Sequence, residues 1–302
     1  GSYGWRTAVR SINQSWRHLP WTFMWSIPES RVATKEDLMR NGHDRFITRR
    51  GLLARAAGGL VLSLTTGQTW WRTQTAEATT GASPPGEALI TRVTRPYDAE
   101  TAVEAFDTWL TPTDRFFVRS HFGPPSAELV YESHWRLRIK GLVDRPLTLS
   151  LKDLGQFEEA TVTAVVQCAG NGRAFFRPRV PGVQWERGAV GNARWTGVRL
   201  RDVLTKAGLH ADARHLQVQG ADRPVSPETP QFVRSLPIEK ALHPDTILAY
   251  RMNDEPLPLL HGAPLRLIAP GWMADSCLKW VTDLSVQAEE AQGFYMQTAY
   301  RY

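Results

Sequence analysis

The chain has 302 residues, enough for one large domain or two small ones, and 42% of them are hydrophobic. Its formal charge of +6 comes entirely from residues 1–78. The remainder is electrically balanced, which excludes a strongly basic nucleic-acid-binding domain. Two cysteines exclude a disulfide framework and a cysteine-rich zinc site.

The basic N-terminal part predicts export or attachment to a membrane. Residues 1–46 form a Trp- and Arg-rich arm, which is either a contact element for a partner or membrane or a weakly structured extension. Residues 47–78 contain Arg49 and Arg50 before an apolar run, the pattern of a twin-arginine export signal. The same pattern fits a retained membrane anchor. We therefore expect a periplasmic or other extracytoplasmic protein, with residues 79–88 as the linker to its main domain.

The main domain, residues 89–302, begins with the pattern of one helix followed by one short strand. Residues 99–110 have the apolar spacing of an amphipathic helix. Residues 116–118 predict a short strand that ends at Arg119 and His121, a position where binding sites are commonly built. A surface arginine and a half-buried histidine are the alternative interpretation.

Residues 161–173, TVTAVVQCAGNGR, predict a buried strand that delivers Cys168 onto a glycine-rich turn with Asn171 and Arg173. Such a turn fixes side chains accurately and leaves backbone N–H groups free for a ligand. We interpret Cys168 as a thiolate ligand beside a fixed cation, and a buried structural cysteine is the alternative. The arginine-rich loop that follows suits a small oxyanion.

The rest of the domain is a mixture of short elements. The patterns predict a turn over residues 188–195, helices over 196–208 and from Ser235 to 242, and strands over 135–142, 216–219, 246–252, 265–269 and 278–286. Regular alternation of strand and helix is missing, which favours an α+β fold over a doubly wound sheet.

Several motifs occur in one order: FFVRSH, VVQCAGNGR, GVQW, GNARWTGVRLRDVL, ILAYRMNDEPLPLLHGAPLRLIAPG and LKWV. With them, residues 89–302 resemble the molybdopterin-binding domain of the sulfite oxidase family. The resemblance implies an α+β domain of mixed β-sheets and short helices. The chain ends about where the family's C-terminal dimerisation domain would begin, so we expect that domain to be absent.

The resemblance also implies a role for each candidate residue. Cys168 would be the metal ligand, Arg119 and Arg173 would bind the anion, and Trp185 would form the aromatic wall of the substrate pocket. Phe232 stands where the family has an active-site tyrosine, and Gly172 where many members have a second arginine. The residues expected to hold the cofactor are His121, Asn171, Asp222, His261, Arg266, Ser276 and Lys279.

The activity implied is oxidation of sulfite to sulfate at a molybdenum-molybdopterin centre. The chain has no haem motif, so electrons would pass to a separate acceptor such as a cytochrome or a membrane carrier. Two other functions stay open: a reductase of sulfoxide-type substrates, and a structural subunit of a membrane electron-transfer complex. A disulfide between Cys168 and Cys277 is a further alternative, although Cys277 reads better as a buried thiol on a strand.

Overall fold

The computed structural model describes residues 89–130 and 133–301. The predicted N-terminal arm, the signal or anchor and the linker lie outside the described residues. Within those two ranges, no helix is both long and apolar enough to cross a membrane.

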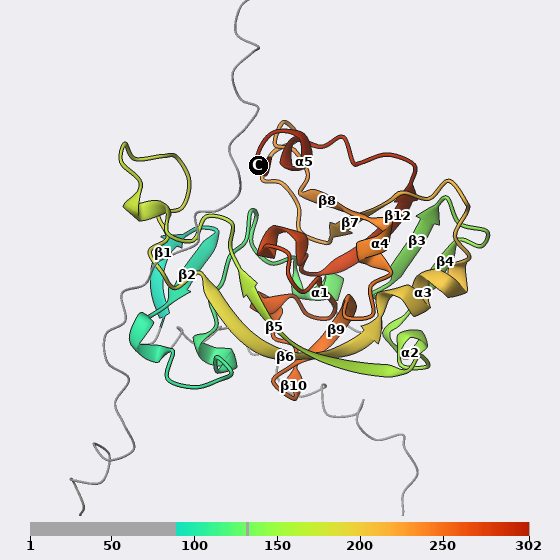
Figure 1. Cartoon of the computed structure of the whole chain (residues 1–302), viewed down its shortest axis with the longest axis horizontal. Coiled ribbons are helices and arrows are strands. Elements are labelled where there is room, and N and C mark those ends of the chain that lie inside the picture. Colours follow the sequence, from blue (N-terminus) through green and yellow to red (C-terminus); the bar gives the residue numbers. More distant parts are fainter. Residues whose placement is uncertain (1–88, 131–132, 302) are drawn as a thin grey trace, which may run out of the picture. The chain divides into compact units, whose positions relative to one another are not determined.

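The described domain is built from three sheets (Figure 1). The small sheet pairs β1 (Leu89–Thr94) with β2 (Tyr97–Thr101). The first large sheet has the order β10 (Glu255–Pro256), β9 (Ile247–Met252), β6 (Val190–Arg199) and β5 (Glu159–Gln167), and β11 (Arg266–Ile268) also pairs with β9. The second has the order β4 (Leu147–Leu149), β3 (Leu137–Gly141), β12 (Val281–Gln287), β7 (His215–Gly220) and β8 (Val233–Pro237).

The pairing within these sheets is antiparallel except between β12 and β3, which are parallel. The α-helices are short: α1 (Ala127–Val130), α2 (Leu151–Leu154), α3 (Leu200–Ala207), α4 (Ile238–Ala241) and α5 (Phe294–Gln297). Antiparallel sheets with few helices confirm the predicted α+β class.

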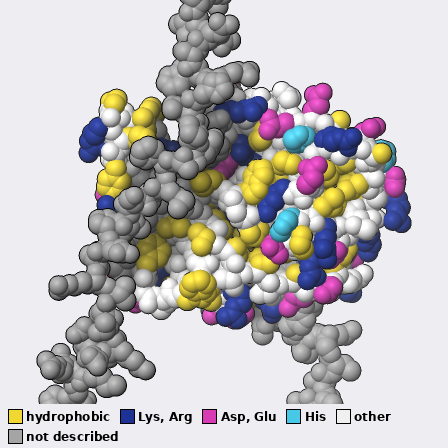
Figure 2. All heavy atoms as spheres, in the orientation of Figure 1, with side chains coloured by type: hydrophobic (Ala, Val, Ile, Leu, Met, Phe, Trp, Pro, Cys, Tyr) yellow, Lys and Arg dark blue, Asp and Glu magenta, His cyan; other side chains and the backbone are white. Residues whose placement is uncertain are grey.

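One continuous apolar core joins the two large sheets. It takes Val166, Trp195 and Leu248 from the first sheet, and Ile139, Leu216 and Leu284 from the second. On β5, inward-facing residues such as Ala164 and Val166 alternate with exposed ones, so the strand ends with a defined face toward the core. On the face seen in Figure 2, acidic and basic side chains are interspersed, in agreement with the balanced charge of this part of the chain.

The helix predicted over residues 99–110 is wrong. β2 occupies its start, and a 3-10 turn at Val103–Ala105 follows. The apolar spacing was misleading because polar side chains are buried here: Glu100 is 1% exposed and binds Arg92 and the backbone N–H of Glu186. A strand with buried charges does not show the simple alternation that identifies strands in a sequence.

Two further boundaries differ from the prediction. Residues 188–195 were expected to form a turn, but β6 begins at Val190 and continues to Arg199, so α3 starts only at Leu200. Glycine marks close packing here instead of a turn, since a Cβ on Gly191 would lie 2.4 Å from the Phe116 ring.

Ser235 also does not cap a helix. It lies within β8, and α4 begins after Pro237. The strand predicted over residues 278–286 begins later, because β12 starts at Val281. Cys277 was also expected on a strand, but it follows a 3-10 turn at Ala274–Ser276. The predicted strands over residues 135–142, 216–219 and 246–252 are confirmed as β3, β7 and β9.

Candidate active site

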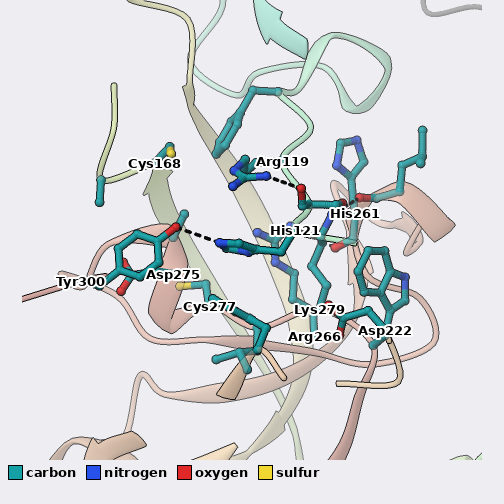
Figure 3. Close-up of a pocket in the computed structure, with 18 residues that line it drawn as sticks. Arg119, His121, Cys168, Asp222, His261, Arg266, Asp275, Cys277, Lys279 and Tyr300 are labelled. Carbon is teal, nitrogen blue, oxygen red and sulfur yellow. Dashed lines mark hydrogen bonds between the residues drawn. The ribbon is translucent and has the colours of Figure 1, made fainter. Parts of the chain in front are cut away.

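A pocket of about 690 Å³, partly continuous with solvent, lies where loops from both large sheets meet (Figure 3). The predicted residues that line it are Arg119, His121, Cys168, Asp222, Phe232, His261, Arg266 and Lys279. These residues are spread along the sequence from Arg119 to Lys279, and the fold brings them together.

Cys168 directly follows β5 and is 7% exposed. The backbone N–H of Gly170 points at its Sγ, at 3.4 Å, and burial raises the pKa of the thiol. Cys168 and Cys277 are both free and both line the pocket, so the disulfide alternative is wrong. A soft, nearly buried sulfur at the rim of a cavity can serve as a metal ligand once its proton is displaced.

Arg119 is fixed by a buried carboxylate. Its Nη1 donates to Asp98 Oδ2 at 3.1 Å and to the carbonyl oxygen of Ser120, while Asp98 also accepts from the Ser120 N–H at 2.8 Å. Asp98 is 1% exposed. The guanidinium is therefore held in one position beside the pocket, as bidentate recognition of an anion requires.

The two pocket histidines are held neutral. Burial, together with the nearby charge of Arg119, lowers the pKa of His121 to about 2. Burial and Arg266 lower the pKa of His261 to about 3. The His261 Nε2 lies 3.1 Å from the carbonyl oxygen of Thr113, which accepts only, so this nitrogen carries the proton. Both rings can therefore orient a ligand by hydrogen bonding without adding charge.

Two other cations have no carboxylate partner within ion-pair distance in the described domain. Lys279 Nζ donates to Ser120 Oγ at 2.8 Å and to the Leu260 carbonyl at 2.9 Å. Arg266 donates from Nη1 to the His261 carbonyl at 2.9 Å, and its buried Nε has no partner. Burial lowers the pKa of both groups, that of Arg266 to about 10.

Buried charge without a counter-ion is costly, and an anionic ligand would compensate it. One acidic lining residue, Asp222, can offset only one of these two charges; burial raises the pKa of its carboxyl to about 6, so it is mostly ionised at neutral pH. The pocket thus has an excess of fixed positive charge.

Four predicted residues do not line the pocket. The guanidinium of Arg173 packs against Gly170 and Gly182, where a Cβ would lie 2.5 and 2.8 Å from it, and donates to the Val183 carbonyl at 3.0 Å. Trp185 is fully buried, and its Nε1 has no partner. Asn171 accepts from the Ala189 N–H at 3.1 Å, which closes the turn after Cys168.

The fourth, Ser276, is buried between the lining residues Asp275 and Cys277. In this structure Arg173 and Trp185 therefore shape the loop beside Cys168 and do not face the cavity. The direction of these side chains depends on the path of residues 173–185, which residue identity does not reveal.

The sequence interpretation missed two residues that line the pocket, Asp275 and Tyr300. Asp275 lines the pocket and forms a buried ion pair with Arg234, at 2.6 Å, with both side chains at most 5% exposed. Tyr300 lines the pocket near the end of the described chain, and its hydroxyl lies 3.1 Å from His121 Nε2. The arginine at a buried strand position was a usable signal for the ion pair, whereas the sequence around Tyr300 carries none.

The family model of the oxidoreductase molybdopterin-binding domain matches residues 121–295. The chain belongs to this family. A sulfite oxidase of Arabidopsis thaliana is 35% identical over 230 residues, covering 72% of this chain and 58% of that protein. The mitochondrial sulfite oxidase of Drosophila melanogaster is 36% identical over 213 residues, covering 68% of this chain and 36% of that protein.

Among solved structures, the sulfane dehydrogenase SoxCD of Paracoccus pantotrophus superposes with a TM-score of 0.61 and 30% identity, covering 69% of this chain and 51% of that one. The chain thus spans about a third to three fifths of the length of these relatives. The fold is that of a sulfite oxidase-type molybdopterin domain.

The donor set fits the cofactor that the family name implies. The described residues contain no group of three or more His, Cys, Asp or Glu side chains that could hold a metal ion. They do offer the sulfur of Cys168 at the pocket, whose lining also contains Cys277 and the two buried cations that lack a carboxylate partner, Arg266 and Lys279. A metal carried by an anionic organic cofactor would match both features.

Proposed function

We propose that this protein oxidises a small sulfur oxyanion, with sulfite as the leading candidate, and passes the electrons to a separate acceptor protein. The observation that carries the proposal is the concentration of Cys168, Arg119, Lys279 and Arg266 around one cavity. The similarity to two sulfite oxidases and to a sulfane dehydrogenase supports a sulfur compound as the substrate.

Each side chain then has a physical task. Cys168 would bind the molybdenum, and the cofactor would supply the two-electron redox chemistry when bound. Arg266 and Lys279 would neutralise its anionic groups, with the neutral His121 and His261 and the carboxyl of Asp222 as hydrogen-bonding partners. Arg119, already oriented by Asp98, would bind the substrate oxygens.

The remaining predicted residues would act without direct contact with the substrate or the cofactor. Asn171 and Ser276 would support the loops that carry Cys168 and the cofactor contacts, and Trp185 would hold the loop of Arg173. Arg173 would contribute long-range attraction for an anion, since its charge is felt at Cys168.

The direct test is reduction of ferricyanide or a c-type cytochrome by sulfite, using purified protein loaded with molybdenum-molybdopterin. The wild type is expected to reduce the acceptor. Cys168→Ser is expected to retain the fold and the pterin but to lose at least about a hundredfold in rate, because a hydroxyl is a poor substitute for a soft thiolate. The proposal fails if sulfite reduces no acceptor, or if Cys168→Ser keeps near-normal activity.

Phe232 favours one second candidate, a reductase of sulfoxide-type compounds. Its ring stacks on His121 at 4.2 Å and offers no hydroxyl to the pocket. Reoxidation of the chemically reduced enzyme by a sulfoxide, without reduction by sulfite, would establish this alternative. A third possibility, a structural subunit with an inactive site, would be supported by cofactor content well below one molybdenum per few chains.

The cellular setting belongs to the same proposal. The Arg49-Arg50 pattern supports export by the twin-arginine route, with residues 1–78 either cleaved or retained at the membrane. A periplasmic location would place the enzyme beside soluble cytochromes and membrane electron carriers. Fractionation of cells with an intact or an Arg49→Lys/Arg50→Lys signal would test it.

A further inference from the structure

The last described residues of the chain are fixed to the edge of the second large sheet. The Ala291 N–H donates to Ser235 Oγ at 3.1 Å, and Arg234 donates to the Tyr295 carbonyl at 2.5 Å. Farther along, Arg301 forms an ion pair with Glu290 at 2.9 Å. This C-terminal segment, residues 290–301, is therefore tied to β8 and to itself, and it contributes Tyr300 to the lining of the pocket.

Tyr300 is held by this segment in a defined position. Its Oη lies 3.1 Å from His121 Nε2, and the guanidinium carbon of Arg234 lies 5.3 Å from its ring centroid. Arg234 is in turn fixed by Asp275 at 2.6 Å. A hydrogen bond at the hydroxyl and a cation over the ring leave the phenol little rotational freedom.

The hydroxyl of Tyr300 stays protonated at neutral pH, because burial raises its pKa to about 12. His121 is neutral as well, so its Nε2–H can donate to the Tyr300 oxygen. In that tautomer the phenol hydrogen remains available to a ligand. Cys168, Arg119 and Arg173 all influence the ionisation of Tyr300, which places the phenol within electrostatic reach of the sulfur.

The other polar groups of the pocket are less free. Arg119 is bonded to Asp98 and Ser120, and Lys279 is bonded to Ser120 and Leu260. Asp222 and Asp275 would repel an anion when ionised, and Phe232 has no donor. Figure 3 shows Tyr300 below Cys168, with its hydroxyl directed toward His121.

We propose that Tyr300 is a substrate-binding residue whose hydroxyl donates a hydrogen bond to the oxyanion that enters the pocket of Cys168. The inference rests on the proposed function for the identity of the oxyanion, but it depends on the structure alone for the presence of an anion site. It means that the C-terminal segment is part of the substrate pocket and supplies the hydroxyl that Phe232 lacks.

The test compares two tyrosines of the same segment in the cofactor-loaded protein. Tyr300→Phe removes the hydroxyl and keeps the ring. Tyr295→Phe is the matched control, because its ring also packs on His121, at 4.7 Å, while Tyr295 does not line the pocket. Measured quantities are the KM and kcat for sulfite, the Kd of sulfate by calorimetry, and the molybdenum and pterin content per chain.

Tyr300→Phe is expected to raise the KM for sulfite and the Kd of sulfate by about tenfold or more, the usual cost of one hydrogen bond to a charged group. Because the bond acts on bound substrate and transition state alike, kcat should stay within about twofold. Tyr295→Phe should leave all four quantities within about twofold, and neither variant should lose cofactor.

The proposal is overturned if the sulfate Kd of Tyr300→Phe equals that of the wild type, or if Tyr295→Phe weakens sulfate binding equally. Loss of cofactor with unchanged sulfate affinity would also overturn it, since Tyr300 would then only position His121. A wild type that binds sulfate through Tyr300 but does not oxidise sulfite would disprove the proposed function and leave this inference standing.

Discussion

Burial determines the protonation state of individual side chains in the pocket, and for His261 this makes the stability of the protein depend on pH. Its pKa is lowered from 6.5 to about 3, so the unfolded chain takes up a proton below pH 6.5 that the folded protein refuses. The contribution of the neutral His261 to the free energy of unfolding is therefore fully present above pH 6.5 and is lost as the pH falls toward 3.

We expect this loss to distinguish the wild type from His261→Gln, whose amide can still donate to the Thr113 carbonyl. Between pH 6.5 and 5, the wild type should lose about 2 kcal/mol of unfolding free energy that the variant does not lose. Urea denaturation of the cofactor-free proteins across this range measures the difference. Parallel curves for the two proteins would contradict the assignment of a neutral His261.

Residue identity alone located much of this site, for reasons that are local. Cys168 follows a buried strand, and Arg119 and His121 follow a short apolar run, so their positions at the pocket could be expected. Arg173 could not be placed, because its guanidinium lies in a space created by the absence of side chains on Gly170 and Gly182. Tyr300 depends on long-range contacts of the C-terminal segment, which no local pattern encodes.

At the scale of elements, the backbones of β6 and β9 approach each other closely at Gly197. The pairing shifts register between Thr196 and Gly197, and a Cβ on Gly197 would lie 1.9 Å from the Leu248 carbonyl oxygen. A glycine at this position reflects close backbone approach, as did the glycine of the same strand that was mistaken for part of a turn.

Gly197→Ala is expected to destabilise the protein by about 3 kcal/mol or more, because the backbone of β9 must move to accommodate the methyl group. The comparison is Gly271→Ala, where φ is +81° but nothing lies within 4 Å of the added Cβ. That variant should lose only about 1 kcal/mol, from the left-handed backbone alone. Thermal denaturation of both variants ranks the costs, and equal losses would contradict the close-approach interpretation.

The strands that could be predicted from the sequence are those with one buried face and one more exposed face. β3 and β7 alternate buried and less buried residues, and the spacing of their apolar side chains identified them. β2 buries charged side chains, and β6, although its first six residues alternate in burial, has Gly191 and Ala193 at buried positions. Sequence patterns fail here because they identify an inward-facing position by a large apolar side chain, which these positions lack.

For the molecule as a whole, we expect the stability of the folded state to depend on the ligand bound in the pocket. Both large sheets contribute to one core, and the pocket at their junction contains Lys279 and Arg266 without carboxylate partners in the described domain. A ligand that binds only the folded state stabilises it by mass action. An anionic cofactor that also neutralises buried cations should therefore raise the melting temperature strongly.

Lys279→Met tests this coupling between charge, cofactor and fold. Methionine keeps the volume of the aliphatic chain but removes the buried charge. The cofactor-free variant should therefore melt no lower than the cofactor-free wild type. Its gain in melting temperature on cofactor loading should be smaller than that of the wild type by at least about half. Lys152→Met, on the exposed side of α2, is the control and should gain as much as the wild type. Calorimetry on loaded and cofactor-free samples gives both values. If Lys279→Met gained as much stability from the cofactor as the wild type does, the buried lysine would not be a partner of the cofactor's anionic group.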